Sequence, residues 1–197
     1  MKKCKVVLCL LLIWLTTACA TKVAPSSEYL LIDQHAQHVT AMTTSSLAIQ
    51  FMPVSMANYL SGNEIVLVTK QGQVHRSKNH LWAETLSPQL SRLTLQRLEK
   101  SLPNITWFGG QRLPPESIAV LNIEVDDFYA DLKGVVHISG RWQLLSALGE
   151  VLSVKTFYAT EDLKADGYLN MVKTLSDIWF QKVVSSISEN ISMSMYK

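Results

Sequence analysis

The sequence predicts an α/β fold in a single domain, with a mixed sheet that ends in an antiparallel meander and is packed by two main helices. Residues 120–128 and 136–144 alternate apolar and polar side chains, which is typical of half-buried strands. Two other segments, 88–102 and 166–187, instead carry apolar residues at helical spacing. About 180 residues remain after the N-terminal signal described next, a length that suits one domain.

The start of the chain predicts a lipoprotein signal peptide over residues 1–18. Lysines precede an uncharged apolar run, and small residues stand directly before Cys19. The run is shorter than the roughly 20 residues that a membrane-spanning helix needs. We therefore expect the segment to be removed.

Cys19 is the predicted lipidation site. The lipobox usually has leucine where this chain has Thr16, with Leu15 one residue earlier. Because Cys4 and Cys9 leave with the signal, Cys19 is the one cysteine of the mature chain, and acylation explains this odd exported thiol. A single acyl chain anchors only marginally, whereas a lipoprotein cysteine carries up to three. The alternative is a plain signal peptide followed by an unrelated cysteine.

The mature chain is close to electrical neutrality, because the signal removes three of the 18 basic residues and none of the 16 acidic ones. This balance gives no reason to expect nucleic acid as a partner. Residues 19–28 are small and polar and are predicted as a lipidated tether that reaches at most roughly 30 Å. Residues 29–197 form the predicted domain.

The elements follow in order along the domain. β-branched and apolar runs separated by turn residues predict strands, and Gln71 and Gly72 predict a hairpin. The predicted strands are 29–33, 47–54, 64–70, 74–77, 105–108, 120–128, 136–144 and 151–159. The last three of these form the antiparallel meander.

Both helices are predicted to pack on the sheet. The first begins with Ser87 as N-cap and Pro88 as first residue. Its apolar face consists of Leu90, Leu93, Leu98 and Leu102. The second begins with Asp166 as N-cap and is amphipathic. Its polar face mixes both charges, which favours packing on the sheet over lying in a membrane interface.

No motif in the chain predicts catalysis, a metal or a cofactor. G-x-S-x-G, P-loop and G-x-G-x-x-G patterns do not occur, and no free mature thiol is expected. His35 and His38 lack the partners of a metal site, and the five histidines are predicted to be solvated at the surface. Asp126 and Asp127 are predicted to form a solvated strand end. The chain is therefore not expected to be an enzyme.

Five short segments, taken together, carry a resemblance to a known family. They are Tyr29-Leu30-Leu31, Met52-Pro53-Val54, Asn58-Tyr59-Leu60, Glu64-Ile65-Val66 and Leu81-Trp82-Ala83-Glu84-Thr85-Leu86. With the lipobox, this order resembles the auxiliary lipoproteins of ABC-type transport systems, the PqiC (YmbA) family. Thr85 stands where the family has proline. Met56-Ala57-Asn58 departs from the charged residue that usually precedes the tyrosine, which puts the partner of that segment in doubt.

The resemblance implies a lipid-anchored protein on the periplasmic face of the outer membrane. It implies a PqiB-like, periplasm-spanning MCE-domain partner in an intermembrane lipid transport system, and self-association. Ala20 agrees with outer-membrane sorting, since Asp at this position retains lipoproteins at the inner membrane.

Three residues of the resembling segments are candidate partner contacts: Tyr59, Trp82 and Glu84. Tryptophan is enriched at interfaces but is also a common core anchor. Glu84 also favours the dipole of the following helix. Two other functions remain open: a periplasmic lipid-binding carrier, for which bound phospholipid would argue, and an envelope hydrolase, for which a pocket joining Ser, His and Asp would argue.

Overall fold

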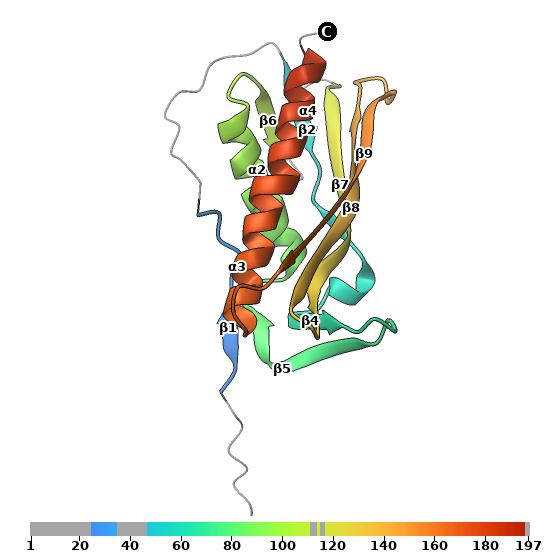
Figure 1. Cartoon of the computed structure of the whole chain (residues 1–197). Coiled ribbons are helices and arrows are strands. Elements are labelled where there is room, and N and C mark those ends of the chain that lie inside the picture. Colours follow the sequence, from blue (N-terminus) through green and yellow to red (C-terminus); the bar gives the residue numbers. More distant parts are fainter. Residues whose placement is uncertain (1–24, 35–46, 111–113, 115–116, 196–197) are drawn as a thin grey trace, which may run out of the picture.

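A computed structural model describes residues 25–34, 47–110, 114 and 117–195. Cys19, His35 and His38 lie outside these residues. The described chain forms one nine-stranded mixed sheet covered by α2 (Leu86–Ser101) and by a C-terminal helix (Figure 1). The strands are β1 (Ser27–Tyr29), β2 (Ala48–Phe51), β3 (Ser55–Met56), β4 (Glu64–Val68), β5 (Val74–Trp82), β6 (Thr106–Gly109), β7 (Ala119–Asp131), β8 (Val135–Leu145) and β9 (Val151–Asp162).

The predicted mixed sheet and its antiparallel meander are confirmed. β7, β8 and β9 pair antiparallel in sequence order, and β4 and β5 form the predicted hairpin. On its other edge β7 pairs in parallel with β2, β3 and β4 at successive positions. All three meander strands are longer than the period-two pattern predicted. A bulge between Val125 and Asp127 lets β7 continue to Asp131.

The predicted strand 47–54 is shorter in the structure: β2 covers only Ala48–Phe51, and β3 begins at Ser55, after the predicted end. The backbone of Val54 forms its hydrogen bonds with side chains of α2 instead of with a strand. Its N–H donates to Ser91 Oγ (2.8 Å), and its carbonyl accepts from Ser87 Oγ (2.6 Å). This contact also corrects the predicted N-cap. Ser87 lies inside α2, whose N-cap is Thr85 without a side-chain capping bond.

The first strand is also displaced, from the predicted 29–33 to Ser27–Tyr29. After Tyr29 the chain leaves β5 because Leu31 is buried in the core. The Leu31 N–H donates to Gln89 Oε1 of α2 (2.9 Å), and the Ile32 N–H donates to Ser176 Oγ of the C-terminal helix (3.4 Å). Both helices therefore hold the segment that follows the tether.

The C-terminal helix is continuous but changes type. It comprises α3 (Tyr168–Ile178), a π-helical turn η2 (Trp179–Val184) and α4 (Ser185–Met195). It begins after Gly167, whose φ is 104°, and Asp166 is not its N-cap. The wider turn buries Trp179, whose Nε1–H donates to Thr94 Oγ1 of α2 at 2.9 Å. The π turn has no signal in the sequence.

The core lies between the sheet and the two helices and centres on a row of aromatic rings. Phe128 contacts Trp82 with a centroid distance of 6.5 Å and Trp179 at 6.1 Å. Phe157 of β9 also contacts Trp179, edge to face, with a centroid distance of 5.9 Å. The helices cover this face of the meander, so the alternate side chains of β7, β8 and β9 form an open face.

Candidate functional site

Trp82, the first of the three candidate contacts, is a core residue. Its side chain is 2% exposed and packs on Phe128. The core-anchor interpretation therefore applies, because so little of the indole is available to a partner in this structure. A large aromatic ring prefers apolar surroundings, which accounts for the buried position of Trp82 at the end of β5.

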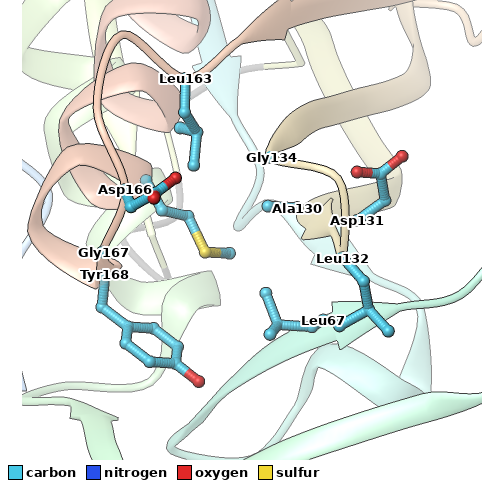
Figure 2. A pocket seen from close by; sticks show the side chains of 10 residues that line it. Leu67, Ala130, Asp131, Leu132, Gly134, Leu163, Asp166, Gly167 and Tyr168 are labelled. Atoms are coloured by element: carbon cyan, nitrogen blue, oxygen red, sulfur yellow. The ribbon is translucent and has the colours of Figure 1, made fainter.

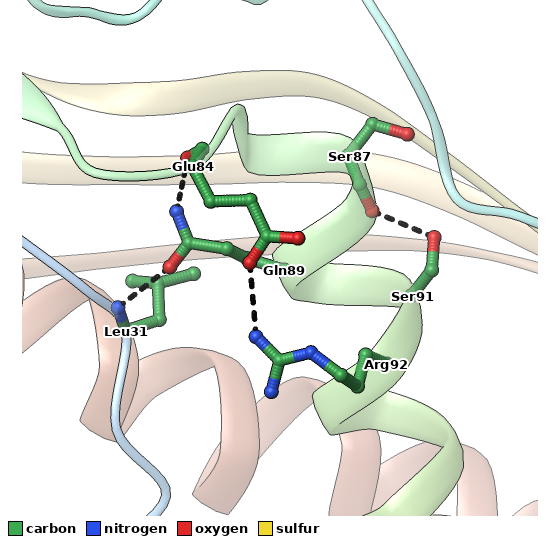
Figure 3. Close-up of polar contacts among 6 residues, drawn as sticks. All are labelled: Leu31, Glu84, Ser87, Gln89, Ser91 and Arg92. Atoms are coloured by element: carbon green, nitrogen blue, oxygen red, sulfur yellow. Dashed lines mark hydrogen bonds and ion pairs between the residues drawn. The ribbon is translucent and has the colours of Figure 1, made fainter.

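Glu84 lies at the start of α2 and is accessible. Its carboxylate pairs with Arg92 Nη2 at 3.0 Å (Figure 3), and both side chains are about half exposed. An exposed pair of this kind contributes little to stability. Glu84 and Arg92 therefore present an acid and a base side by side, which a polar partner could contact.

Gln89 is a structural residue that the sequence analysis missed. It is fully buried, and its amide links two segments: Oε1 accepts from the Leu31 N–H, while Nε2 donates to the carbonyl of Glu84 (Figure 3). An unpaired buried amide would be costly, so the two bonds fix the position of the chain after β1. The sequence signal for this role was the position of Gln89, a polar residue next to Leu86 and Leu90 on the apolar side of α2.

Tyr59 lies on the open face of the sheet, in the short 3-10 helix η1 (Asn58–Leu60). Its hydroxyl is 2.9 Å from the carbonyl oxygen of Asp126 and 3.0 Å from Asp127 Oδ1. Ser139 Oγ donates to the other carboxylate oxygen of Asp127. Burial and then the negative charge of Asp127 raise the pKa of Tyr59 far above its usual value. The phenol is therefore a protonated donor at every physiological pH.

The same contacts correct the interpretation of Asp126 and Asp127 as a solvated strand end. Asp127 lies within β7, opposite Ser139, and is half-buried under Tyr59. The bulge at Val125 allows this, since it changes the register just before Asp127. Asp126 remains exposed.

Two histidines are less solvated than predicted. His137 stacks on Tyr129 across the strands and lies 3.6 Å from Asp131 Oδ2. Although burial opposes it, hydrogen bonds from the backbone N–H groups of Val135 and Lys133, together with His137, lower the pKa of Asp131. Burial raises the pKa of Tyr129.

His80 is the second of these histidines. Its Nδ1 lies 2.9 Å from the Tyr29 hydroxyl, and its ring stacks on Tyr168 at 4.0 Å. The ring therefore ties β1 to the first residue of α3. A lone histidine in a strand gives no sequence signal for this role.

Ser, His and Asp side chains do meet on the open face, but in two separate pairs. Ser139 donates to Asp127, and His137 faces Asp131. A hydrolytic nucleophile would instead need its hydroxyl to donate to the histidine. Within the described ranges, no group of three or more His, Cys, Asp or Glu residues is arranged to hold a metal. In the same ranges no helix is long and apolar enough to cross a membrane.

An apolar pocket of about 200 Å³ opens where α3 begins. Figure 2 shows Tyr168 and Leu132 on opposite walls, with Leu67 below and Leu163 above. The carboxylate of Asp131 points away from the pocket. The volume is below the roughly 300–1,000 Å³ of typical small-molecule sites.

Tyr59, Trp82 and Glu84 thus have different surroundings: the open face, the core and the start of α2. They do not form one site within the described part of the chain. Cys19 lies outside it.

Comparisons with known proteins identify the family. Residues 29–187 match the model of the ABC-type transport auxiliary lipoprotein component. The intermembrane transport lipoprotein PqiC of Escherichia coli (strain K12) is 31% identical over 137 residues, which are 69% of this chain and 71% of that protein. PqiC of Shigella flexneri matches equally.

Solved structures share the fold. The crystal structure of an uncharacterized protein superposes with a TM-score of 0.71 at 28% identity, over 85% of this chain and 99% of the other. A protein from Xanthomonas campestris has a TM-score of 0.70 at 15% identity, over 87% of this chain and 97% of the other. The chain belongs to the family of ABC-type transport auxiliary lipoprotein components.

Proposed function

We propose that this protein is a non-catalytic lipoprotein subunit of a Pqi-like, MCE-type intermembrane lipid transport system. Acylated Cys19 anchors it to the periplasmic face of the outer membrane after the signal over residues 1–18 is removed. The folded domain docks on or caps a PqiB-like, periplasm-spanning MCE-domain partner and supports the integrity of the envelope. The observation that carries this proposal is the 31% identity with PqiC across 69% of the chain.

The way in which the described chain begins supports an anchored role. Residues 31 and 32 are hydrogen-bonded to both helices, and Asp33 pairs with Arg97 of α2 at 3.2 Å. Because this segment is fixed to both helices, a tether attached to it holds the whole domain close to the membrane. Ser27 and Glu28 of the predicted tether lie in β1, so residues 19–26 act as the short link between lipid and fold.

Three places on the described surface support contact with other proteins, including further copies of this chain. β9 is a long edge strand that pairs with β8 alone among the described strands, and several of its large apolar side chains are exposed. Such an edge is a ready template for association unless it is covered. Tyr59 and Glu84 supply polar contacts elsewhere.

The test is a pull-down from native membranes with the wild type and Cys19→Ala. We expect the wild type to fractionate with the outer membrane and to capture the MCE-domain protein. Cys19→Ala should be unlipidated and absent from the outer membrane. Cys9→Ala is the matched control, because Cys9 lies in the signal and should leave both results unchanged. A Cys19→Ala protein that stays in the outer membrane would contradict the anchor.

A lipid-binding carrier is the second candidate; the apolar pocket beside Tyr168 is the observation that bears on it, although its volume is below that of a typical small-molecule site. Mass spectrometry of lipids extracted from the purified protein separates the two. Stoichiometric phospholipid bound without an MCE-domain partner would support the carrier function.

A further inference from the structure

The end of the domain where the described chain begins combines three neighbouring features, which we call the tether end. They are the β4–β5 turn (69–73), the β7–β8 turn (131–135) and the loop 163–167 with the first turn of α3. The two turns lie side by side because β4 and β7 are parallel and Val68 pairs with Asp131. The pocket beside Tyr168 joins the loop to the second turn.

The tether also enters at this end. Ser27 of β1 pairs with His80 of β5, and His80 stacks on Tyr168 at the start of α3. Figure 1 shows β1 and β5 at the same end of the domain as the start of α3. Cys19 precedes Ser27 by only eight residues. Even fully extended, these reach about 27 Å, so the acylated cysteine stays near this end. The short covalent link from Cys19 to β1 thus makes the tether end the part of the domain closest to the bilayer.

The side chains of the tether end suit a phospholipid surface. Leu132 is 62% exposed at its turn, and Leu169 is 69% exposed in the first turn of α3. Lys70 and Lys133 flank Leu132 across a shallow hollow of about 220 Å³. An exposed leucine can enter the acyl boundary while the ammonium groups of neighbouring lysines stay at the phosphates.

The tether end carries charges of both signs. Lys70, Lys133 and Lys164 are exposed. The exposed acids are Asp162 and Asp166, while the backbone N–H groups of Lys133 and Val135 bind Asp131. Three lysines and three carboxylates, those of Asp131, Asp162 and Asp166, therefore balance at this end, and Lys70 and Lys133 are the two cations that line the hollow with Leu132.

We propose that the tether end rests directly on the phospholipid bilayer, with Leu132 and Leu169 inserted in the interface and Lys70 and Lys133 at the phosphates. This inference rests on the proposed lipid anchor at Cys19. It adds an orientation: β7, β8 and β9 stand away from the membrane, and their far ends point toward the periplasm.

The opposite end of the sheet provides a matched control. Leu148 is 87% exposed in the β8–β9 turn. The eleven residues of β8 separate this turn from the β7–β8 turn, a distance of about 36 Å. Its neighbours include Glu150 and no lysine. Exposed leucines are therefore present in both turns, but among the described residues lysines stand beside Leu132 and none stands in the β8–β9 turn.

The experiment uses the full lipidated protein, reconstituted in phospholipid vesicles. Leu132→Cys and Leu148→Cys each supply one reactive thiol for an environment-sensitive fluorophore, since acylated Cys19 does not react. We expect the probe at 132 to shift its emission to the blue and to be quenched by spin-labelled lipids. The probe at 148 should do neither. Adding Lys70→Glu and Lys133→Glu should reduce the shift at 132.

Each outcome decides between the claims. Flotation with vesicles and the mass of the acylated peptide first establish the anchor. If the protein is unlipidated, the proposed anchor fails. If it is lipidated and floats but the probes at 132 and 148 respond alike, the orientation is wrong while the anchor stands. A probe at 132 that becomes shielded only when an MCE-domain partner is added assigns this end to protein contact, and that also overturns the proposal.

Discussion

The two faces of the meander are built from alternate residues of the same strands but hold different chemistry. The helix-covered face carries Phe128 and Phe157 against Trp179, and its polar groups are paired inside the core. The open face carries Tyr59 and Asp127 in a polar network that stays half accessible to water. The difference indicates that one face supplies stability and the other remains available for contact. Substitutions that act on one face test this division.

Trp179→Ala is expected to have the largest effect on stability. The substitution removes the ring that joins Phe128, Phe157 and Thr94, and it should lower the free energy of unfolding by about 3–5 kcal/mol. Urea denaturation of the purified protein measures the change. Trp107→Ala, on the partly exposed edge strand β6, is the control and should lose clearly less. Equal losses would contradict the central role of the Trp179 row.

Gln89→Ala is expected to have the second-largest effect on stability. It leaves the buried Leu31 N–H without its acceptor, and the expected loss is about 1–3 kcal/mol. Faster amide exchange at Leu31 would show that the tether-side segment has been released. Gln96→Ala changes the same residue type on the exposed side of α2 and should stay within about 0.5 kcal/mol of wild type. If both variants are equally stable, Gln89 does not fix the segment.

Tyr59→Phe tests the open face, and its effect should be smaller. Loss of the hydroxyl removes its contacts with Asp126 and Asp127, at about 1 kcal/mol. The pKa of Tyr59 is raised in the folded state, so its contribution is fully present below the unfolded pKa of about 10 and declines as the pH rises above it. The stability difference between wild type and variant should therefore narrow above pH 10.

Tyr158→Phe is the control for that measurement, because Tyr158 is 73% exposed on β9. Its stability should match wild type at neutral pH. If Tyr158→Phe loses as much stability as Tyr59→Phe, the effect of Tyr59→Phe cannot be assigned to its contacts with Asp127.

Glu84→Gln should have the smallest effect on stability, below about 0.5 kcal/mol, because its pair with Arg92 is half exposed. Its informative readout is capture of the MCE-domain partner. Reduced capture with unchanged unfolding would support Glu84 as a partner contact. Unchanged capture would remove Glu84 from the candidates.

Local patterns predicted the strands and helices, but not where their ends lie. The alternation that includes Ile123 and Trp142 identified the meander because one face is buried. The strand ends were missed where backbone groups find other partners, as at Val54, which bonds to Ser87 and Ser91. Ser87 could not be predicted in that role, since its partner lies 33 residues away in sequence.

The sequence by itself determined the fold class, the family resemblance and the predicted position of the anchor, because periodicity and short motifs are local properties of the chain. The tertiary structure decided the rest. It buried Trp82, made Gln89 the link to the tether-side segment and placed Tyr59 on Asp127. It also gathered Lys70, Leu132 and Lys133 at one end. These arrangements depend on contacts between segments far apart in the sequence, which local periodicity does not encode.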